Sequence, residues 1–229
     1  MIGVDGCNGG WIVAARGRAV IRCRRIARLE ELFAESPAPE VVAVDIPIGL
    51  PENGARACDV AVRELLGPRR GSSVFPAPPR ALLAATSFEE AGRLRERIEH
   101  KRISRQTWLI VPKIAEVDAL LRRSAAARAA THEVHPEVSF YYLNGERPVL
   151  APKRKPAGHA ERVELLRSWC GDAIDRALAQ RARLACGADD VVDAFAALWT
   201  AERIAGGKAV THPVNAELDA HGLPMSISA

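Results

Sequence analysis

The chain has 229 residues, of which 48% are hydrophobic, and a formal net charge of +4. This length and apolar content are typical of one well-filled globular domain, spanning 1–229. The five cysteines show no CxxC spacing, which argues against a disulfide framework and against a zinc site. The chain lacks both a run of ~18 apolar residues and a signal peptide, so we expect a cytoplasmic protein without membrane contact. The mildly basic charge is compatible with a nucleic-acid or phosphate partner but does not require one.

The N-terminal segment 1–11 places one carboxylate, Asp5, at the end of an apolar run. Glycines and an asparagine follow at once, and the apolar pattern resumes at Trp11, which predicts a β-hairpin. Asp5 would then face an opening lined by glycines, where a ligand or a metal ion can approach the backbone closely. We therefore expect Gly6 and Asn8 to contact the substrate. An ordinary turn with a capping aspartate is the alternative.

A second carboxylate, Asp45, lies at the end of another predicted strand. After a short strand predicted at 19–23 and a short helix at 29–35, the apolar run in 40–47 indicates a strand buried on both faces, and therefore a parallel one. Asp45 lies at its end, and the prolines and glycine of 47–51 cannot continue a central strand. In open α/β sheets this edge is where ligands bind.

Residues of about 52–125 are predicted to form a loop and helical insertion. Helices are expected at 87–100, with Ser87 as the N-cap, and from 104 onward through Lys113. Lys113 could reach the cleft, with a plain surface position as the alternative. The segment 68–80 is rich in Pro, Arg and Ser and is predicted to be a long loop. Its arginines, Arg69, Arg70 and Arg80, are candidates for phosphate binding, with a solvated surface loop as the alternative.

Residues 131–140 are predicted to form a third site strand. Glu133, His135 and Glu137 are spaced by two and would share one face of it, although Pro136 argues for a bulge or a strand end. We expect Glu137 to be catalytic and His135 to contact the substrate, with a solvent-facing edge strand as the alternative. A basic patch at 153–156 and a helix at about 160–169 follow.

The last long helix opens at 188 with three aspartates. The helix dipole and capping explain an acid in the first turn, such as Asp190. They do not explain Asp193, which is surrounded by apolar residues and therefore needs a partner. The tail 206–229 is turn-rich and has no clear role. Hard oxygen ligands on separate elements suit Mg²⁺ or Mn²⁺, and two such ions promote hydrolysis of a phosphodiester.

Six segments along nearly the whole chain carry a family resemblance: GVDGCNGGW at 3–11, DIPIGLP at 45–51, SVFP at 73–76, KIAEVD at 113–118, EVHPEVSF at 133–140 and DVVDA at 190–194. In these segments the chain resembles the bacterial DUF 429 family, which is described as predicted nucleases of ribonuclease H-like fold. The resemblance implies an α/β fold with a mixed five-stranded sheet, its first three strands antiparallel, surrounded by helices.

The resemblance also implies the site. Holliday-junction resolvases of the same superfamily place acids on the first strand, the fourth strand and the last helix. Carried over, Asp5 and Asp45 would bind or bridge the metal ions, and Asp190 and Asp193 would complete a second metal site. The expected partner is nucleic acid or another phosphodiester.

Two other functions stay open. Actin-like ATPases and sugar kinases of the superfamily wrap nucleotide phosphates with a first-strand Asp-Gly hairpin, but this chain is too short for their duplicated domain. A non-catalytic phosphate-binding module that keeps its acids for a structural cation is the third possibility.

Overall fold

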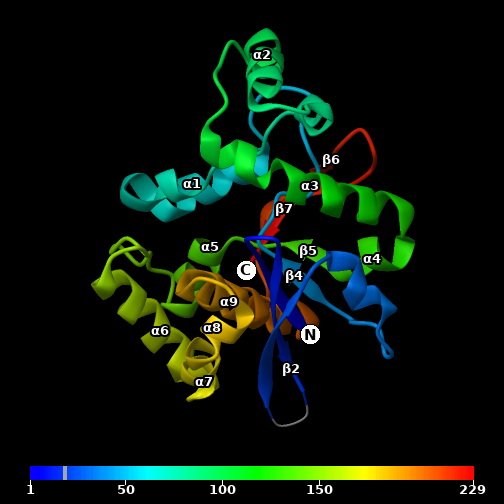
Figure 1. Cartoon of the computed structure of the whole chain (residues 1–229). Helices are drawn as coiled ribbons and strands as arrows, with labels where there is room; N and C mark the ends of the chain where they lie inside the picture. Colours follow the sequence, from blue (N-terminus) through cyan, green and yellow to red (C-terminus); the bar gives the residue numbers. More distant parts are fainter. Residues whose placement is uncertain (18–19) are drawn as a thin grey trace.

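The structure is a computed structural model that describes residues 1–17 and 20–229. A five-stranded sheet lies at its centre, in the order β3-β2-β1-β4-β5 (Figure 1). Its strands are β1 (Ile2–Cys7), β2 (Gly10–Arg16), β3 (Ile21–Ile26), β4 (Val42–Val44) and β5 (Thr131–Glu133). The pairs β1–β2 and β2–β3 are antiparallel, whereas β4 is parallel to both β1 and β5. The predicted α/β class and mixed five-stranded sheet flanked by helices are confirmed, and so is the parallel strand before Asp45.

Both faces of the sheet are buried, because the side chains of β2 alternate between two apolar clusters. Ile12 and Ala14 pack with the helices that follow β5, while Trp11 and Val13 pack on the opposite face with α3 (Arg105–Arg123) and the short 3-10 helix η1 (Leu29–Ala34). The helices after β5 gather on one side of the strands in Figure 1. They are α5 (Pro136–Leu143), α6 (Pro156–Cys170), α7 (Ala173–Ala179), α8 (Arg181–Leu184) and α9 (Ala188–Ala205).

Helix α9 lies directly against β1, β2 and β4. The approach is closest at Gly3 of β1, where an added Cβ would lie 2.0 Å from the backbone nitrogen of Leu198. A glycine is therefore needed there for the helix to pack on the strand. This packing fixes the first turns of α9 beside the ends of β1 and β4.

The elements between β4 and β5 are α1 (Ala57–Arg70), η2 (Gly71–Ser73), η3 (Arg80–Ala84), α2 (Phe88–Glu99), α3 (Arg105–Arg123) and α4 (Ala125–Ala130). The helix at 87–100 is confirmed, with the Ser87 hydroxyl accepting from the backbone of Glu90. The loop predicted at 68–80 is wrong over its first part, since α1 continues to Arg70 and η2 follows. Gly67 has φ 69° and kinks the helix, and Pro68 then begins a new helical stretch because its φ is suited to a first turn.

The strand predicted at 131–140 is also wrong beyond Glu133. Strand β5 ends there, and α5 begins at Pro136. Proline is favoured at the first position of a helix, and the His135 ring nitrogen accepts the backbone N–H of Glu137 at 3.2 Å. Glu133, His135 and Glu137 therefore do not share one strand face.

The tail and the third strand also differ from expectation. Residues 206–229, predicted only as turns, contain an antiparallel pair of strands, β6 (Thr211–Leu218) and β7 (Pro224–Ser228). The third strand, predicted at 19–23, runs from Ile21 to Ile26. Its predicted first residue, Ala19, lies outside the described residues.

Candidate functional site

Three aspartates predicted from separate parts of the chain converge beside the sheet. Asp5 lies near the end of β1, and Asp45 directly follows β4, the parallel neighbour of β1. Asp193 lies in the second turn of α9, which packs across both strands. Parallel pairing and the helix contact thus bring together carboxylates that are far apart in sequence.

All three aspartates have raised pKa values, in part because they lie close to one another. Burial, followed by repulsion from Asp193 and Asp45, raises the pKa of Asp5 well above its usual range. Burial is also the main cause that raises the pKa of Asp45 to about 6 and that of Asp193 to about 6, against an opposing effect of Lys153. Removing a carboxylate from water disfavours its charged form, and like charges nearby add to the effect. The cluster is therefore poised to take up positive charge.

Lys153 supplies such a charge. Its Nζ lies 2.5 Å from Oδ2 of Asp193, while Oδ1 of the same carboxylate is buried and has no hydrogen-bond partner among the described residues. Burial lowers the pKa of Lys153, but attraction to Asp193, Asp45 and Asp5 outweighs burial and raises it. The sequence placed Lys153 only in a basic patch, because no local pattern indicates that the loop before α6 lies close to β1.

Asp190, the fourth predicted ligand, caps α9. Its Oδ2 accepts the backbone N–H of Gly187 at 2.8 Å. Burial raises the pKa of Asp190, the bond from Gly187 lowers it, and the neighbouring Asp189 raises it again. Asp190 also contributes to the raised pKa of Asp5, but less than Asp45 and Asp193 do. Its capping role is the one that the helix pattern explained without a metal.

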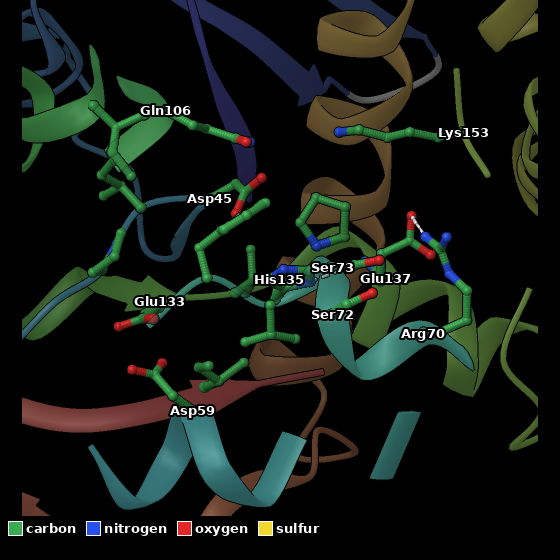
Figure 2. Close-up of a pocket in the computed structure, with 18 of the residues that line it drawn as sticks. Asp45, Asp59, Arg70, Ser72, Ser73, Gln106, Glu133, His135, Glu137 and Lys153 are labelled. Carbon is green, nitrogen blue, oxygen red and sulfur yellow. Dashed lines mark hydrogen bonds and ion pairs between the residues drawn. The ribbon is translucent and has the colours of Figure 1, made fainter. Parts of the chain in front are cut away.

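Glu137 lies next to the aspartates but is already neutralised. Its carboxylate is 2.9 Å from a guanidinium nitrogen of Arg70 (Figure 2) and 2.6 Å from one of Arg162. Arg70, predicted to bind phosphate, therefore has a carboxylate partner inside the protein. His135 lies half-buried beside this group, and partial burial lowers its pKa, so the ring stays neutral around pH 7.

Two of the other predicted phosphate ligands do not reach the cluster. Arg80 pairs with Asp118 at 2.9 Å and also with Asp219, which engages its guanidinium within the fold. Arg69 is exposed near the end of α1 and does not line the cavity beside the acids.

The hairpin residues Gly6 and Asn8, predicted to contact the substrate, lie beside the side chains of Lys113 and Arg25. Lys113 donates to the carbonyl of Gly10, and its Nζ lies 4.2 Å from the centre of the Trp11 ring. Gly6 is covered by the Lys113 side chain, since an added Cβ would lie 2.8 Å from Lys113 Cδ. Asn8 is exposed in the turn, and its carbonyl accepts a hydrogen bond from Arg25. Lys113 thus closes one side of the hairpin.

A cavity of about 430 Å³ opens beside Asp45. Figure 2 shows Gln106 and Lys153 reaching toward Asp45 from opposite sides, with Ser72, Ser73 and His135 below them. The apolar part of its wall includes residues of five segments: Ile46, Val74, Phe75, Ile110, Val134 and Ile227. Such a volume lies within the range of small-molecule sites.

A buried ion cluster supports one side of this cavity. Arg56 binds Glu133 through two bonds of 2.7 Å and Asp59 through bonds of 2.6 and 3.1 Å. Arg56 also donates to the carbonyls of Ile48 and Gly49, which belong to the loop after Asp45. The cluster thereby ties that loop to β5 and α1.

A family model described as "Protein of unknown function (DUF429)" matches residues 3–218. The chain belongs to the DUF429 family. No curated protein and no solved structure matches it. All the aspartates of the DUF429 cluster, and the residues around its cavity except Ile227, lie within the matched range.

Two absences apply to the part of this DUF429 protein that the structure describes, 1–17 and 20–229. Within it, three or more His, Cys, Asp or Glu side chains are nowhere arranged to hold a metal ion. None of its helices is long and apolar enough to cross a membrane. Besides Lys153, sequence reasoning missed Gln106, which lies in an ordinary first helical turn and gave no signal.

Proposed function

We propose that this DUF429 protein is a divalent-metal-dependent phosphodiester hydrolase, a nuclease of ribonuclease H-like fold. The observation that carries the proposal is the convergence of Asp5, Asp45 and Asp193 in one cluster, in which Asp5 and Asp193 are buried and Asp45 is half-buried. Carboxylates held close together away from water are costly to keep ionised without a cation. A divalent metal ion would supply that positive charge.

The topology supports the ribonuclease H-like part of the proposal. The resemblance implies a mixed five-stranded sheet whose first three strands are antiparallel, and in this chain β1–β2 and β2–β3 are antiparallel while β4 is parallel to β1 and β5. Asp5 on β1, Asp45 after β4 and Asp193 on α9 occupy the first strand, the fourth strand and the last helix. These are the elements that carry the acids in the resembling resolvases.

The donor atoms are of the type that Mg²⁺ or Mn²⁺ prefers, namely carboxylate oxygens. Among the described residues Asp193 Oδ1 is buried without a partner, but the carboxylates are not arranged to hold an ion as they stand, so binding would require their side chains to move. Asp5, Asp45 and Asp193 would hold the metal, with Asp190 at the edge of the set. When bound, a divalent ion would activate water and stabilise the leaving oxygen of a phosphodiester.

The remaining chemistry belongs to side chains of the chain itself. The Lys153 side chain is 37% exposed and comes from a loop, so its ammonium can turn from Asp193 to a substrate phosphate. Arg154 also lines the cavity and adds a second cation on the same side. Glu137 is paired with Arg70 and Arg162, so it would fix the first turn of α5 and would not contact the substrate.

The test is hydrolysis of a labelled oligonucleotide by the purified chain with Mg²⁺, with Mn²⁺ and with EDTA. We expect metal-dependent cleavage that falls by at least about 100-fold in Asp5→Asn, because loss of a charged group that acts in the transition state typically has such an effect. The matched control is Asp175→Asn, whose side chain is 45% exposed on α7 and away from the cavity.

Three outcomes would count against the proposal. Equal activity in Asp5→Asn and wild type would remove the cluster from catalysis. Turnover of ATP without cleavage of any phosphodiester would favour the kinase alternative. Binding of phosphate compounds without turnover in either assay would favour a non-catalytic module.

A further inference from the structure

The cavity beside Asp45 has a shape and a lining that the proposed phosphodiester chemistry does not itself require. Of the groups that metal ions and a scissile phosphate need, only Asp45, Lys153 and Arg154 line the cavity, whereas Asp5 and Asp193 do not. The remainder of the 430 Å³ is lined by a mixture of polar side chains and apolar ones, among them Ile46, Val74 and Ile110. Apolar side chains with a few placed polar groups are typical of sites for small ligands that have an apolar part joined to a charged part.

Phe75 is the most informative residue of this cavity. It lines the cavity, yet it is 45% exposed, whereas its neighbour Val74 is only 2% exposed. An aromatic ring left partly open at a cavity offers a face on which a planar group can stack. Aromatic side chains that bind single-stranded nucleic acids use such faces, because every base has a π-face to match.

Polar groups line the cavity as well. Gln106, exposed in the first turn of α3, brings an amide that donates and accepts hydrogen bonds, as base edges do. Lys153 enters from the loop before α6 on the side of Asp45 opposite Gln106 (Figure 2), and Arg154 of the same loop also lines the cavity. A base stacked on Phe75 and a phosphate beside Lys153 would both lie within this one cavity.

We propose that this cavity binds one unpaired nucleotide, with its base stacked on Phe75 and its phosphate beside Lys153 and Asp45. A base can stack on Phe75 only where its face is not covered by neighbouring bases of a duplex, so we expect the cavity to take an unpaired nucleotide and not continuous duplex. The unit comes either from a free mononucleotide or from a single strand, since both present the same chemistry. The inference rests on the proposed function for what is cleaved, but binding is measured without cleavage.

The experiment measures binding of the full-length protein in EDTA, where no metal-dependent turnover occurs. A fluorescent single-stranded oligonucleotide, the same strand in a duplex, and AMP and UMP as competitors are compared for wild type and Phe75→Ala. We expect the single strand to bind more tightly than the duplex, and Phe75→Ala to weaken it by about tenfold, a typical effect of removing one stacking ring. Phe75→Trp should keep the wild-type affinity.

Val214→Ala is the matched control, because Val214 is an apolar side chain that is 88% exposed on β6 and does not line the cavity. Competition by AMP or UMP identifies a free nucleotide as a sufficient ligand, whereas binding of the oligonucleotide alone identifies the strand. Equal binding of duplex and single strand, or equal binding by Phe75→Ala and wild type, would overturn the inference.

The two proposals fail separately. If no phosphodiester is hydrolysed but Phe75-dependent binding is found, the proposed function falls and the nucleotide cavity stands. If Asp5-dependent cleavage is found with no dependence on Phe75, the cavity inference falls and the hydrolase stands.

Discussion

Asp193→Asn is expected to stabilise the protein at neutral pH while it abolishes metal-dependent cleavage. The carboxylate is 2% exposed, and one of its oxygens lacks a partner among the described residues. Asparagine has nearly the same shape, and its side-chain oxygen still accepts the hydrogen bond from Lys153. The substitution therefore removes a buried charge and changes the packing very little.

The magnitude follows from the pKa of Asp193, which rises from 3.8 to about 6, mainly through burial. Each pKa unit corresponds to about 1.4 kcal/mol, so ionisation costs the folded state about 3 kcal/mol. Between pH 3.8 and about 6 the folded chain retains a proton that the unfolded chain has lost. Stability contributed by this group therefore falls as the pH rises through that interval, and the loss is complete above it.

The assay is urea denaturation of wild type and Asp193→Asn in EDTA at several pH values. We expect the variant to be more stable by up to about 3 kcal/mol at pH values above about 6, with no difference below pH 3.8. Asp175→Asn should behave in the opposite way, because the hydrogen bond from Arg167 lowers the pKa of Asp175 and its loss removes a favourable contact. Stabilisation at the expense of activity is common at functional sites.

The reasoning would be refuted if Asp193→Asn were as stable as wild type or less stable above pH 6. It would also be refuted if both proteins lost stability equally between pH 4 and pH 6. Either result would mean that Lys153 alone compensates the negative charge of Asp193, so that the cluster does not need a second cation.

Three other substitutions test neighbouring features. Arg56→Met leaves Glu133 buried without its cation and should lower the free energy of unfolding by about 3–5 kcal/mol in urea; an unchanged value would contradict the role of the ion cluster. Gly3→Ala forces β1 away from α9 and should cost at least about 1–3 kcal/mol. Gly92→Ala, whose Cβ meets nothing nearer than 3.9 Å in α2, should instead stabilise by about 0.5–1 kcal/mol, and equal effects would refute the packing argument. Lys153→Met should raise the affinity for Mn²⁺, measured by calorimetry, by about tenfold or more, because the Lys153 ammonium no longer repels the metal ion. An unchanged affinity would show that the ammonium and Mn²⁺ do not compete for the aspartates.

The sequence predicted the parts of the site that depend on apolar runs. Asp5 and Asp45 could be placed because each ends a run too apolar to lie anywhere but inside a sheet. Asp193 could be placed because an acid among valines and alanines has no local explanation. Where such strands lie side by side, their ends meet, and the helix then adds its own acid.

Contacts between distant segments could not be predicted. Spacing by two suggested that Glu137 lies on a strand, but Pro136 and the His135 cap begin a helix there. Arg80 lies in a segment whose Arg and Ser content suggested phosphate binding, yet its guanidinium pairs with Asp118 and Asp219 inside the protein. No local pattern reveals which carboxylate an arginine will find, and the same applies to Lys153.

The Arg56 cluster sets a limit on how far the chain can be shortened. Segment 52–125 resembles a removable appendage, because its helices separate two adjacent strands of the sheet. Joining β4 directly to β5 would delete Arg56 and strand the Glu133 carboxylate in the interior without a counter-charge. A shortened chain that lacks this segment would therefore need a neutral residue at position 133 before it could fold.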